Sequence, residues 1–146
     1  MILPDVNLLV YAHDELAPLH QPARAWWERA LSGRESVALP WAALFGFIRL
    51  VTHPSVMRDP LPPSAAVERV RGWLARPAAE ILEPGPRHLE IVTRLFAATG
   101  VAGALTTDTH LAALAIEHGC ELHSNDSDFG RFPGLRWRNP LAGAEL

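Results

Sequence analysis

The sequence contains no lysine, a single cysteine and no long hydrophobic run, and each shortage excludes a class of protein. With Cys120 alone, the chain can form neither an internal disulfide nor a zinc site built from several cysteines. We predict Cys120 to be a small buried residue near a strand. No apolar segment reaches the roughly 18 residues that a membrane-spanning helix needs. Asp5 interrupts the apolar start early and no basic segment precedes it, so we expect no signal peptide and a cytoplasmic protein.

All 13 residues that are lysine or arginine are arginines. The formal net charge is −3. This charge does not by itself indicate a nucleic-acid-binding protein. Arginine suits bidentate phosphate contacts, but its exclusive use also follows from GC-rich coding. If a cation neutralised Asp5, Asp108, Asp126 and Asp128, the rest of the chain would hold 13 basic against 12 acidic residues. A weakly positive face would then be available to a partner.

The length and composition predict one domain, from residue 1 to residue 146, with one core. Short apolar segments predict strands at Ile2–Pro4, Ser36–Pro40, Ala79–Pro84 and Cys120–Ser124, with a fifth at Gly134–Arg138. Helical patterns separate them at Asn7–Ala12, His20–Ser32, Trp41–Thr52, Ala65–Arg76 after a Ser64 cap, Arg87–Thr99 and Asp108–His118. This alternation predicts an α/β fold with a four- or five-stranded, mostly parallel central sheet.

Four acids follow strands or open helices in this pattern. Asp5 ends the first strand, Asp108 opens the last helix, and Asp126 and Asp128 lie in the turn after the fourth strand. Each alone has an ordinary explanation as a helix cap or a turn residue. Together they are predicted at one edge of a parallel sheet, where their mutual repulsion needs an offset. A hard divalent cation such as Mg²⁺ or Mn²⁺ provides it and prefers oxygen ligands.

The tryptophans offer rings that could stack on bases or fill the core. We predict Trp41 and Trp73 to be core residues because both lie within apolar helical patterns. The helix that starts at Trp41 is mostly apolar and is predicted to be buried. The neighbours Trp26 and Trp27 cannot both face one core, so we expect one of them at a surface.

Three segments carry a resemblance to a known family: PDVNLLVYA, TDTHLAALAIEHG and SNDSDFGRFPGLRWRNPL. In this order they resemble the PIN-domain family, and most closely the VapC-type toxins of type II toxin–antitoxin systems in a mycobacterial and actinobacterial branch. The likeness runs from Ile2 to Leu141. It implies a PIN-like three-layer α/β/α fold and a Mg²⁺-dependent endoribonuclease acting on transfer or ribosomal RNA, with Mn²⁺ able to substitute. It also implies a homodimer and a VapB-like antitoxin as partner.

The resemblance also assigns roles to single residues. Asp5, Asp108 and Asp126 match the metal-binding and catalytic acids, and Asp128 matches an additional, variable acid. Asn7 and Ser124 match small polar residues that support the site.

One departure concerns a glutamate that the family usually has after the second strand, where this sequence has Gly46. Three outcomes are open: a Mg²⁺ site with more water ligands, one metal ion where relatives hold two, or lost activity. The remaining acids favour retained activity. The alternative is a catalytically weak PIN module that binds RNA or a protein partner without cleavage. A related DNase is disfavoured because the chain lacks the length of such enzymes.

Other polar residues are candidates for contact with RNA or an antitoxin. Arg49 ends the apolar helix that should lie near the site. His110 follows Asp108 by two residues and either reaches a phosphate or lies on the helix surface. Arg131 belongs to a basic C-terminal stretch that either contacts the RNA backbone or is a solvated edge.

Overall fold

The computed structural model describes residues 1–100 and 102–144. In chain order its elements are β1 (Ile2–Pro4), α1 (Val6–His13), α2 (His20–Ser32), β2 (Val37–Pro40), α3 (Trp41–Val51), α4 (Pro63–Leu74), β3 (Ala79–Leu82), α5 (His88–Thr99), the short helix η1 (Gly103–Leu105), α6 (Thr106–His118), β4 (Glu121–His123), the short helix η2 (Ser127–Arg131) and β5 (Trp137–Arg138). No helix among the described residues is long and apolar enough to cross a membrane.

The strands form one sheet in the order β3-β2-β1-β4-β5, and every pairing is parallel. The prediction of a four- or five-stranded, mostly parallel sheet is therefore confirmed, with five strands and every pairing parallel. β1 lies at its centre, where Ile2 pairs with Val37 of β2 on one side and with Glu121 of β4 on the other. Because all strands run the same way, their carboxyl ends lie along one edge of the sheet.

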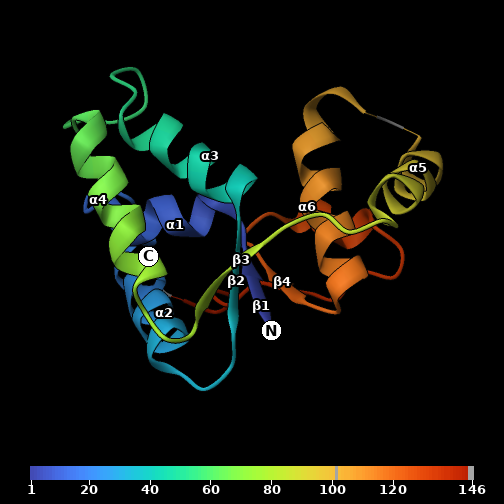
Figure 1. Cartoon of the computed structure of the whole chain (residues 1–146). Helices are drawn as coiled ribbons and strands as arrows, with labels where there is room; N and C mark the ends of the chain where they lie inside the picture. Colours follow the sequence, from blue (N-terminus) through green and yellow to red (C-terminus); the bar gives the residue numbers. More distant parts are fainter. Residues whose placement is uncertain (101, 145–146) are drawn as a thin grey trace.

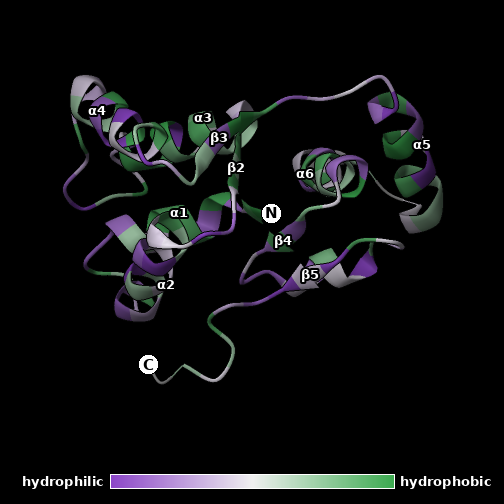
Figure 2. Cartoon of the chain, turned by 60° about the horizontal axis from the view of Figure 1, so that its bottom comes forward, coloured by the Kyte–Doolittle hydropathy of each residue, from purple (hydrophilic) through white to green (hydrophobic). Residues whose placement is uncertain are grey.

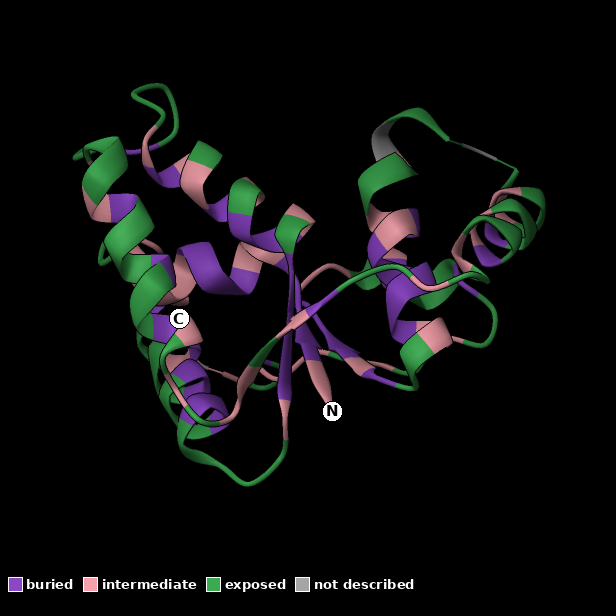
Figure 3. Cartoon of the chain, in the orientation of Figure 1, coloured by how far each residue is buried: buried purple, intermediate pink, exposed green. Residues whose placement is uncertain are grey.

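Helices cover both faces of the sheet and make three layers, as expected. Figure 1 shows α1 to α4 on one side of the strands and α5 with α6 on the other. Alternate strand residues serve the two cores: Val37 and Leu39 pack with α1 to α4, while Ala38 packs with α5 and α6. Figure 3 shows β2 buried between these layers, and Figure 2 shows α1 as more hydrophobic than its neighbour α2.

Glycine ends two helices where the sequence predicted it. Gly100 after α5 and Gly119 after α6 have φ angles of 71° and 68°, which is the left-handed conformation that glycine adopts without strain. The start of α4 was predicted wrongly. Proline begins this helix at Pro63, with Pro62 as its cap, so Ser64 lies inside the first turn.

The prediction that Trp26 or Trp27 lies at a surface is wrong, because both are at least nine-tenths buried. The indole N–H of Trp26 donates to Nδ1 of His123 on β4, over 3.2 Å. The Trp27 ring meets Trp73 of α4 edge to face, with centroids 5.5 Å apart. α2 is thus buried on two sides, against the sheet and against α4.

The prediction for Trp73 is confirmed, and so is that for Cys120, since both are buried. The prediction for Trp41 is wrong, because its side chain is 45% exposed. α3 packs on its neighbours through Leu44, Phe47 and Val51. Its opposite side faces solvent although it carries large apolar residues, so α3 is not buried all round.

Candidate metal centre

Ser124 connects the two ends of the chain at the carboxyl edge of the sheet. Its hydroxyl donates to Oδ2 of Asp5 over 2.7 Å and accepts the backbone N–H of Asp126 over 2.9 Å. The side-chain amide nitrogen of Asn7 also donates to the hydroxyl oxygen of Ser124, over 3.4 Å. Ser124 is fully buried, so this geometry is held within the protein. It lies where a supporting residue was expected.

Asp5 is a buried carboxylate that also caps α1. Its Oδ1 accepts the backbone N–H of Val6 over 2.7 Å. Burial raises the pKa of the Asp5 carboxyl, the hydrogen bonds from Ser124 and Val6 lower it, and the negative charge of Asp126 raises it further. Asp5 is therefore a helix cap through one oxygen, as in the ordinary explanation. That role does not explain how the cost of burying the negative charge is offset.

Asp126 and Asp128 lie in the turn that follows β4. Asp126 caps η2, because its Oδ1 accepts the backbone N–H of Asp128 over 2.9 Å. The more exposed Asp128 side chain lies 3.6 Å from the guanidinium of Arg131. Both acids thus act as turn residues, and Arg131 pairs with a predicted site acid.

Asp108 interacts electrostatically with the three other acids. It is the third residue of α6 and not its first, because that helix begins at Thr106. The pKa of Asp108 is raised from 3.8 to about 6, first by burial and then by the charges of three other carboxylates. These are Asp5, Asp126 and Asp128. The fold therefore brings together all four acids that the sequence pattern singled out.

The chemistry of this donor set fits a hard divalent cation. The donors are carboxylate oxygens, and the side-chain oxygen of Asn7 beside them is buried with no hydrogen-bond partner. Within residues 1–100 and 102–144, no three acidic, histidine or cysteine side chains converge closely enough to hold a metal ion directly. Mg²⁺ usually keeps several waters and binds through one or two carboxylates. The arrangement therefore suits a water-rich Mg²⁺ site.

Gly46, at the position of the usual glutamate, lies close to α1. A Cβ atom at this position would lie 2.8 Å from Cγ2 and 3.3 Å from Cγ1 of Val6. Val6 follows Asp5 directly, and its branched side chain is stiff at χ1. A side chain at position 46 would therefore require the Val6 side chain or one of the two helices to shift.

His110 contacts α5. Its Nδ1 lies 2.8 Å from Nε2 of His88, and burial followed by the neighbouring His88 lowers the pKa of His110. Glu117 lies beyond this pair, with its Oε1 4.0 Å from Nδ1 of His88. No local sequence pattern indicates His88, because only the packing of α5 on α6 brings the two rings together. Arg49 lies exposed on α3, as a contact residue would.

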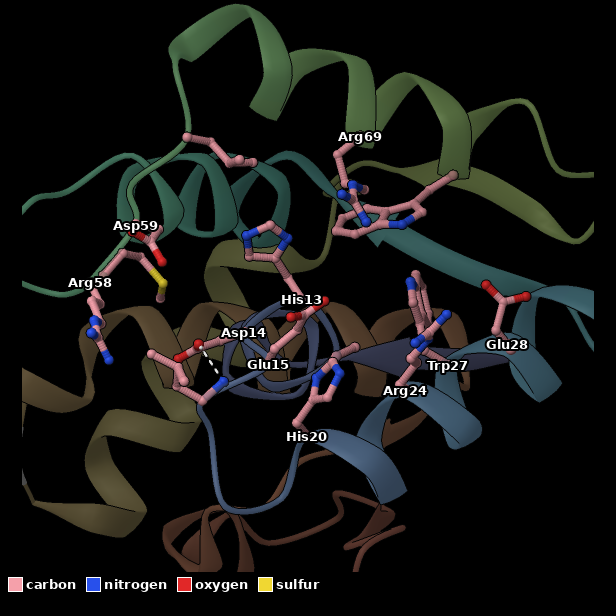
Figure 4. Close-up of a pocket in the computed structure, with 15 residues that line it drawn as sticks. His13, Asp14, Glu15, His20, Arg24, Trp27, Glu28, Arg58, Asp59 and Arg69 are labelled. Carbon is pink, nitrogen blue, oxygen red and sulfur yellow. Dashed lines mark hydrogen bonds between the residues drawn. The ribbon is translucent and has the colours of Figure 1, made fainter.

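A separate cleft of about 460 Å³ lies between the end of α1, the start of α2, the loop before α4, and α4 itself (Figure 4). His13 of α1 and Arg69 of α4 face this space, and burial and Arg69 lower the pKa of His13. None of the four clustered acids lines it. Its arginines are accompanied by acids of the connection between α1 and α2, of α2 and of the loop before α4, so neither sign of charge dominates. The clustered carboxylates, and not this cleft, mark the candidate site.

Ser124→Ala is expected to reduce the free energy of unfolding by about 1–3 kcal/mol at neutral pH, because the buried Asp5 carboxylate loses its hydroxyl donor. The substitution raises the pKa of Asp5 further. The reduction in the free energy of unfolding should have its full size above the pKa of Asp5 in the folded variant. It should become smaller as the pH falls and Asp5 becomes protonated. Urea unfolding at a series of pH values measures it. Ser127→Ala, an exposed position in the same loop, is the control, and an equal loss in both variants would contradict the role of Ser124.

Comparison with known proteins agrees with this fold. The PIN domain family model matches residues 2–135. Ribonuclease VapC33 of Mycobacterium tuberculosis is 46% identical over 141 residues, which cover 97% of this chain and 99% of that protein. Ribonuclease VapC37 of the same organism is 42% identical over 142 residues, covering 97% and 99%.

A solved structure, VapBC2 from Rickettsia felis bound to a DNA fragment from its promoter, aligns with a TM-score of 0.69 and 19% identity, covering 95% of this chain and 98% of that one. At this identity the similarity shows the fold alone. The family model and the two ribonucleases span nearly the whole sequence, and the chain belongs to the PIN-domain family.

Proposed function

We propose that the protein is a Mg²⁺-dependent endoribonuclease, the toxin of a VapBC-type pair, and that it cleaves transfer or ribosomal RNA in the cytoplasm. The observation that carries this proposal is the hydrogen bonding of the buried Ser124 hydroxyl to the Asp5 carboxylate and to the backbone N–H of Asp126, which holds two of the acids together at the carboxyl edge of the sheet. The raised pKa of Asp108, to about 6, agrees with it, because the charges of Asp5, Asp126 and Asp128 contribute to that shift. The names of the relatives, VapC33 and VapC37 ribonucleases, support the reaction class.

The residues divide the work by how each is held. When bound, Mg²⁺ supplies positive charge that stabilises the non-bridging oxygens of the scissile phosphate. Asp5, Asp108 and Asp126 would hold it, directly or through waters. Asp5 is fixed by Ser124 and by Val6.

Among the described residues Asp108 makes no side-chain hydrogen bond, so its carboxylate is free to contact water. Whichever acid contacts water and not the cation accepts the proton of the attacking water. The water oxygen bonds to phosphorus as the bond between phosphorus and the 3′ oxygen breaks. The departing 3′ oxygen takes a proton from solvent water, so the products are a 5′ phosphate and a 3′ hydroxyl.

A VapB-like antitoxin is the expected protein partner, which is supported by the similarity in fold to VapBC2, a complex of this type. A homodimer stays a prediction. The second candidate function, a PIN module that binds RNA without cleaving it, is favoured by Gly46 at the usual glutamate position.

Metal removal separates the two candidate functions. The purified protein should cleave transfer or ribosomal RNA in Mg²⁺, lose cleavage in EDTA, and regain it with Mg²⁺ or Mn²⁺. In cells, expression of the wild type without its antitoxin should arrest growth, and Asp5→Ala and Asp108→Ala should abolish the arrest. RNA binding without cleavage in any metal would favour the second candidate function. Arrest that persists in both variants would exclude the nuclease reaction as its cause.

A further inference from the structure

The main chain of Ser124 is held on both sides by β5. Its backbone N–H donates to the carbonyl oxygen of Arg138 over 3.1 Å, and its carbonyl oxygen accepts the indole N–H of Trp137 over 3.1 Å. β4 and β5 pair through Leu122 opposite Trp137 and His123 opposite Arg138, so Ser124 directly follows this short ladder. The indole N–H therefore satisfies a backbone group that lies past the end of the paired strands.

These two hydrogen bonds fix the direction of the Ser124 hydroxyl. A peptide unit is planar, so the bond from the N–H orients the unit before the Ser124 Cα, and the bond to the carbonyl orients the unit after it. With both units fixed, the Cβ position is set, and the hydroxyl oxygen has only a few staggered positions. The position that it takes lies 2.7 Å from Oδ2 of Asp5 and 2.9 Å from the backbone nitrogen of Asp126. The geometry between the two acids therefore depends on the indole N–H of Trp137.

The ring of Trp137 also supports the far end of the turn that carries the acids. This turn runs from Ser124 into η2. A Cβ atom on Gly130 of η2 would lie 3.6 Å from Cζ3 and 3.8 Å from Cε3 of Trp137, so the ring lies against this helix. Trp137 itself packs against the core made with α5 and α6. Asp126 and Asp128 therefore lie between two segments that Trp137 contacts.

We propose that Trp137 is a positioning residue for the metal centre: by fixing the main chain of Ser124, it keeps Asp5 and Asp126 at the separation that a shared cation needs. This rests on the proposed function and adds to it a residue of β5, beyond the four acids and their two expected supports. A cation held by few direct protein ligands depends on how well those ligands are preorganised, and groups behind the ligands tune the affinity for the metal.

The competing explanation is that Trp137 only fills the edge of the core and pairs its N–H with a nearby carbonyl, as buried tryptophans usually do. The next residues of the chain favour the positioning role. Asn139 follows β5, and its side-chain amide donates to Oδ1 of Asn125 over 3.0 Å. Residues 137, 138 and 139 thus each bond to Ser124 or to its neighbour. Three consecutive residues that bond to one turn hold its main chain, which the filling of a space does not require.

The test measures binding of Mn²⁺ to the purified full chain without RNA, from the electron paramagnetic resonance signal of free Mn²⁺. Trp137→Phe removes the indole N–H and keeps a ring beside Gly130. It should weaken Mn²⁺ binding about tenfold, at the lower end of what the loss of a group behind a metal ligand costs. Trp26→Phe is the matched control, because it removes an indole N–H bonded to the side chain of His123, directly before Ser124. It should leave the affinity for Mn²⁺ unchanged.

A double-mutant cycle asks whether Trp137 acts through Ser124. In the Ser124→Ala background the hydroxyl that Trp137 positions is absent, so Trp137→Phe should weaken Mn²⁺ binding by less than about twofold further. With RNA and Mg²⁺, Trp137→Phe should raise the Mg²⁺ concentration for half-maximal cleavage about tenfold. The rate at saturating Mg²⁺ should stay close to that of the wild type. RNA binding in EDTA should not change, which separates positioning from contact with the substrate.

Benzothienylalanine at position 137 keeps the whole ring system and lacks only the N–H, so it gives the same comparison if Trp137→Phe does not fold. Wild-type affinity for Mn²⁺ in the variant that folds would overturn the positioning role. So would an equal loss of affinity in Trp26→Phe, or losses from Trp137→Phe and Ser124→Ala that add fully.

RNA cleavage by the wild type distinguishes this proposal from the proposed function. If the wild type binds Mn²⁺ and never cleaves RNA, while Trp137→Phe loses affinity for Mn²⁺, the proposed function fails and the positioning role stands. If the wild type cleaves RNA and Trp137→Phe keeps its affinity, only the positioning role fails. A wild type that does not bind Mn²⁺ would overturn both.

Discussion

Replacing Asp108 with asparagine is expected to stabilise the metal-free protein while abolishing RNA cleavage. Asparagine keeps the shape and removes a charge that the other carboxylates repel. A shift of the pKa from 3.8 to about 6 corresponds to about 3 kcal/mol for a fully buried group. Asp108 is only half-buried, so solvent screening reduces the expected gain to about 1–2 kcal/mol at pH 7.5. Chemical denaturation in EDTA measures it.

The sign of the pH dependence follows from the raised pKa of Asp108. Above pH 6, Asp108 is ionised in the folded protein and is repelled by the other carboxylates. Asp108→Asn then raises the free energy of unfolding by its full amount. As the pH falls from about 6 to about 4, the wild type binds this proton more readily when folded, so the gain declines and then disappears. Saturating Mg²⁺, at about 100 times its dissociation constant, should stabilise the wild type by about 2.7 kcal/mol, and the variant much less.

The matched control is Asp59→Asn, which removes an exposed carboxylate in the loop before α4 and should change stability by less than about 0.5 kcal/mol. RNA cleavage by Asp108→Asn should fall at least about a hundredfold, as is typical when one group of a charge-stabilising set is removed. A variant that is less stable than the wild type at pH 7.5 would show that the four acids do not repel one another as described.

Adding one methyl group at Gly46 is expected to destabilise the fold by about 1–3 kcal/mol, because the new Cβ meets Val6 Cγ2 at 2.8 Å. Gly72→Ala in α4 is the opposite case, since a Cβ there has no neighbour within 4 Å. That substitution should stabilise the protein by about 0.5–1 kcal/mol through the restricted unfolded chain. Thermal or urea unfolding of the two single variants gives two shifts of opposite sign.

A double-mutant cycle shows whether Val6 is the cause. Val6→Ala opens space beside position 46, so Gly46→Ala should cost less in that background than in the wild type, by at least about 0.5 kcal/mol. Strict additivity would mean that another contact limits this position. The same cycle with Gly46→Glu asks whether a further carboxylate can be accommodated once Val6 is smaller.

Hydrophobic patterning predicted the sheet and nearly every helix, because short apolar strands and glycine-ended helices are local signals. It also predicted that Asp5 and Asp108 share an edge, since parallel strands place their ends together. Burial was harder to predict for the tryptophans. Trp26 and Trp27 are both buried because α4 covers a second side of α2, and Trp41 is exposed because nothing covers the outer side of α3. Such outcomes depend on which helices meet, and one sequence does not contain that information locally.

The hydrogen bond between Ser124 and Asp5 joins residues 119 positions apart in the chain. β1 is made first during synthesis, yet one of its two neighbours in the sheet, β4, ends only at His123. A growing polypeptide therefore carries Asp5 long before the ribosome releases the segment that completes its surroundings, and domains in general fold only once their distant partners exist. For the proposed ribonuclease, the surroundings of Asp5 can therefore be completed only after the segment with β4 and Ser124 has been made.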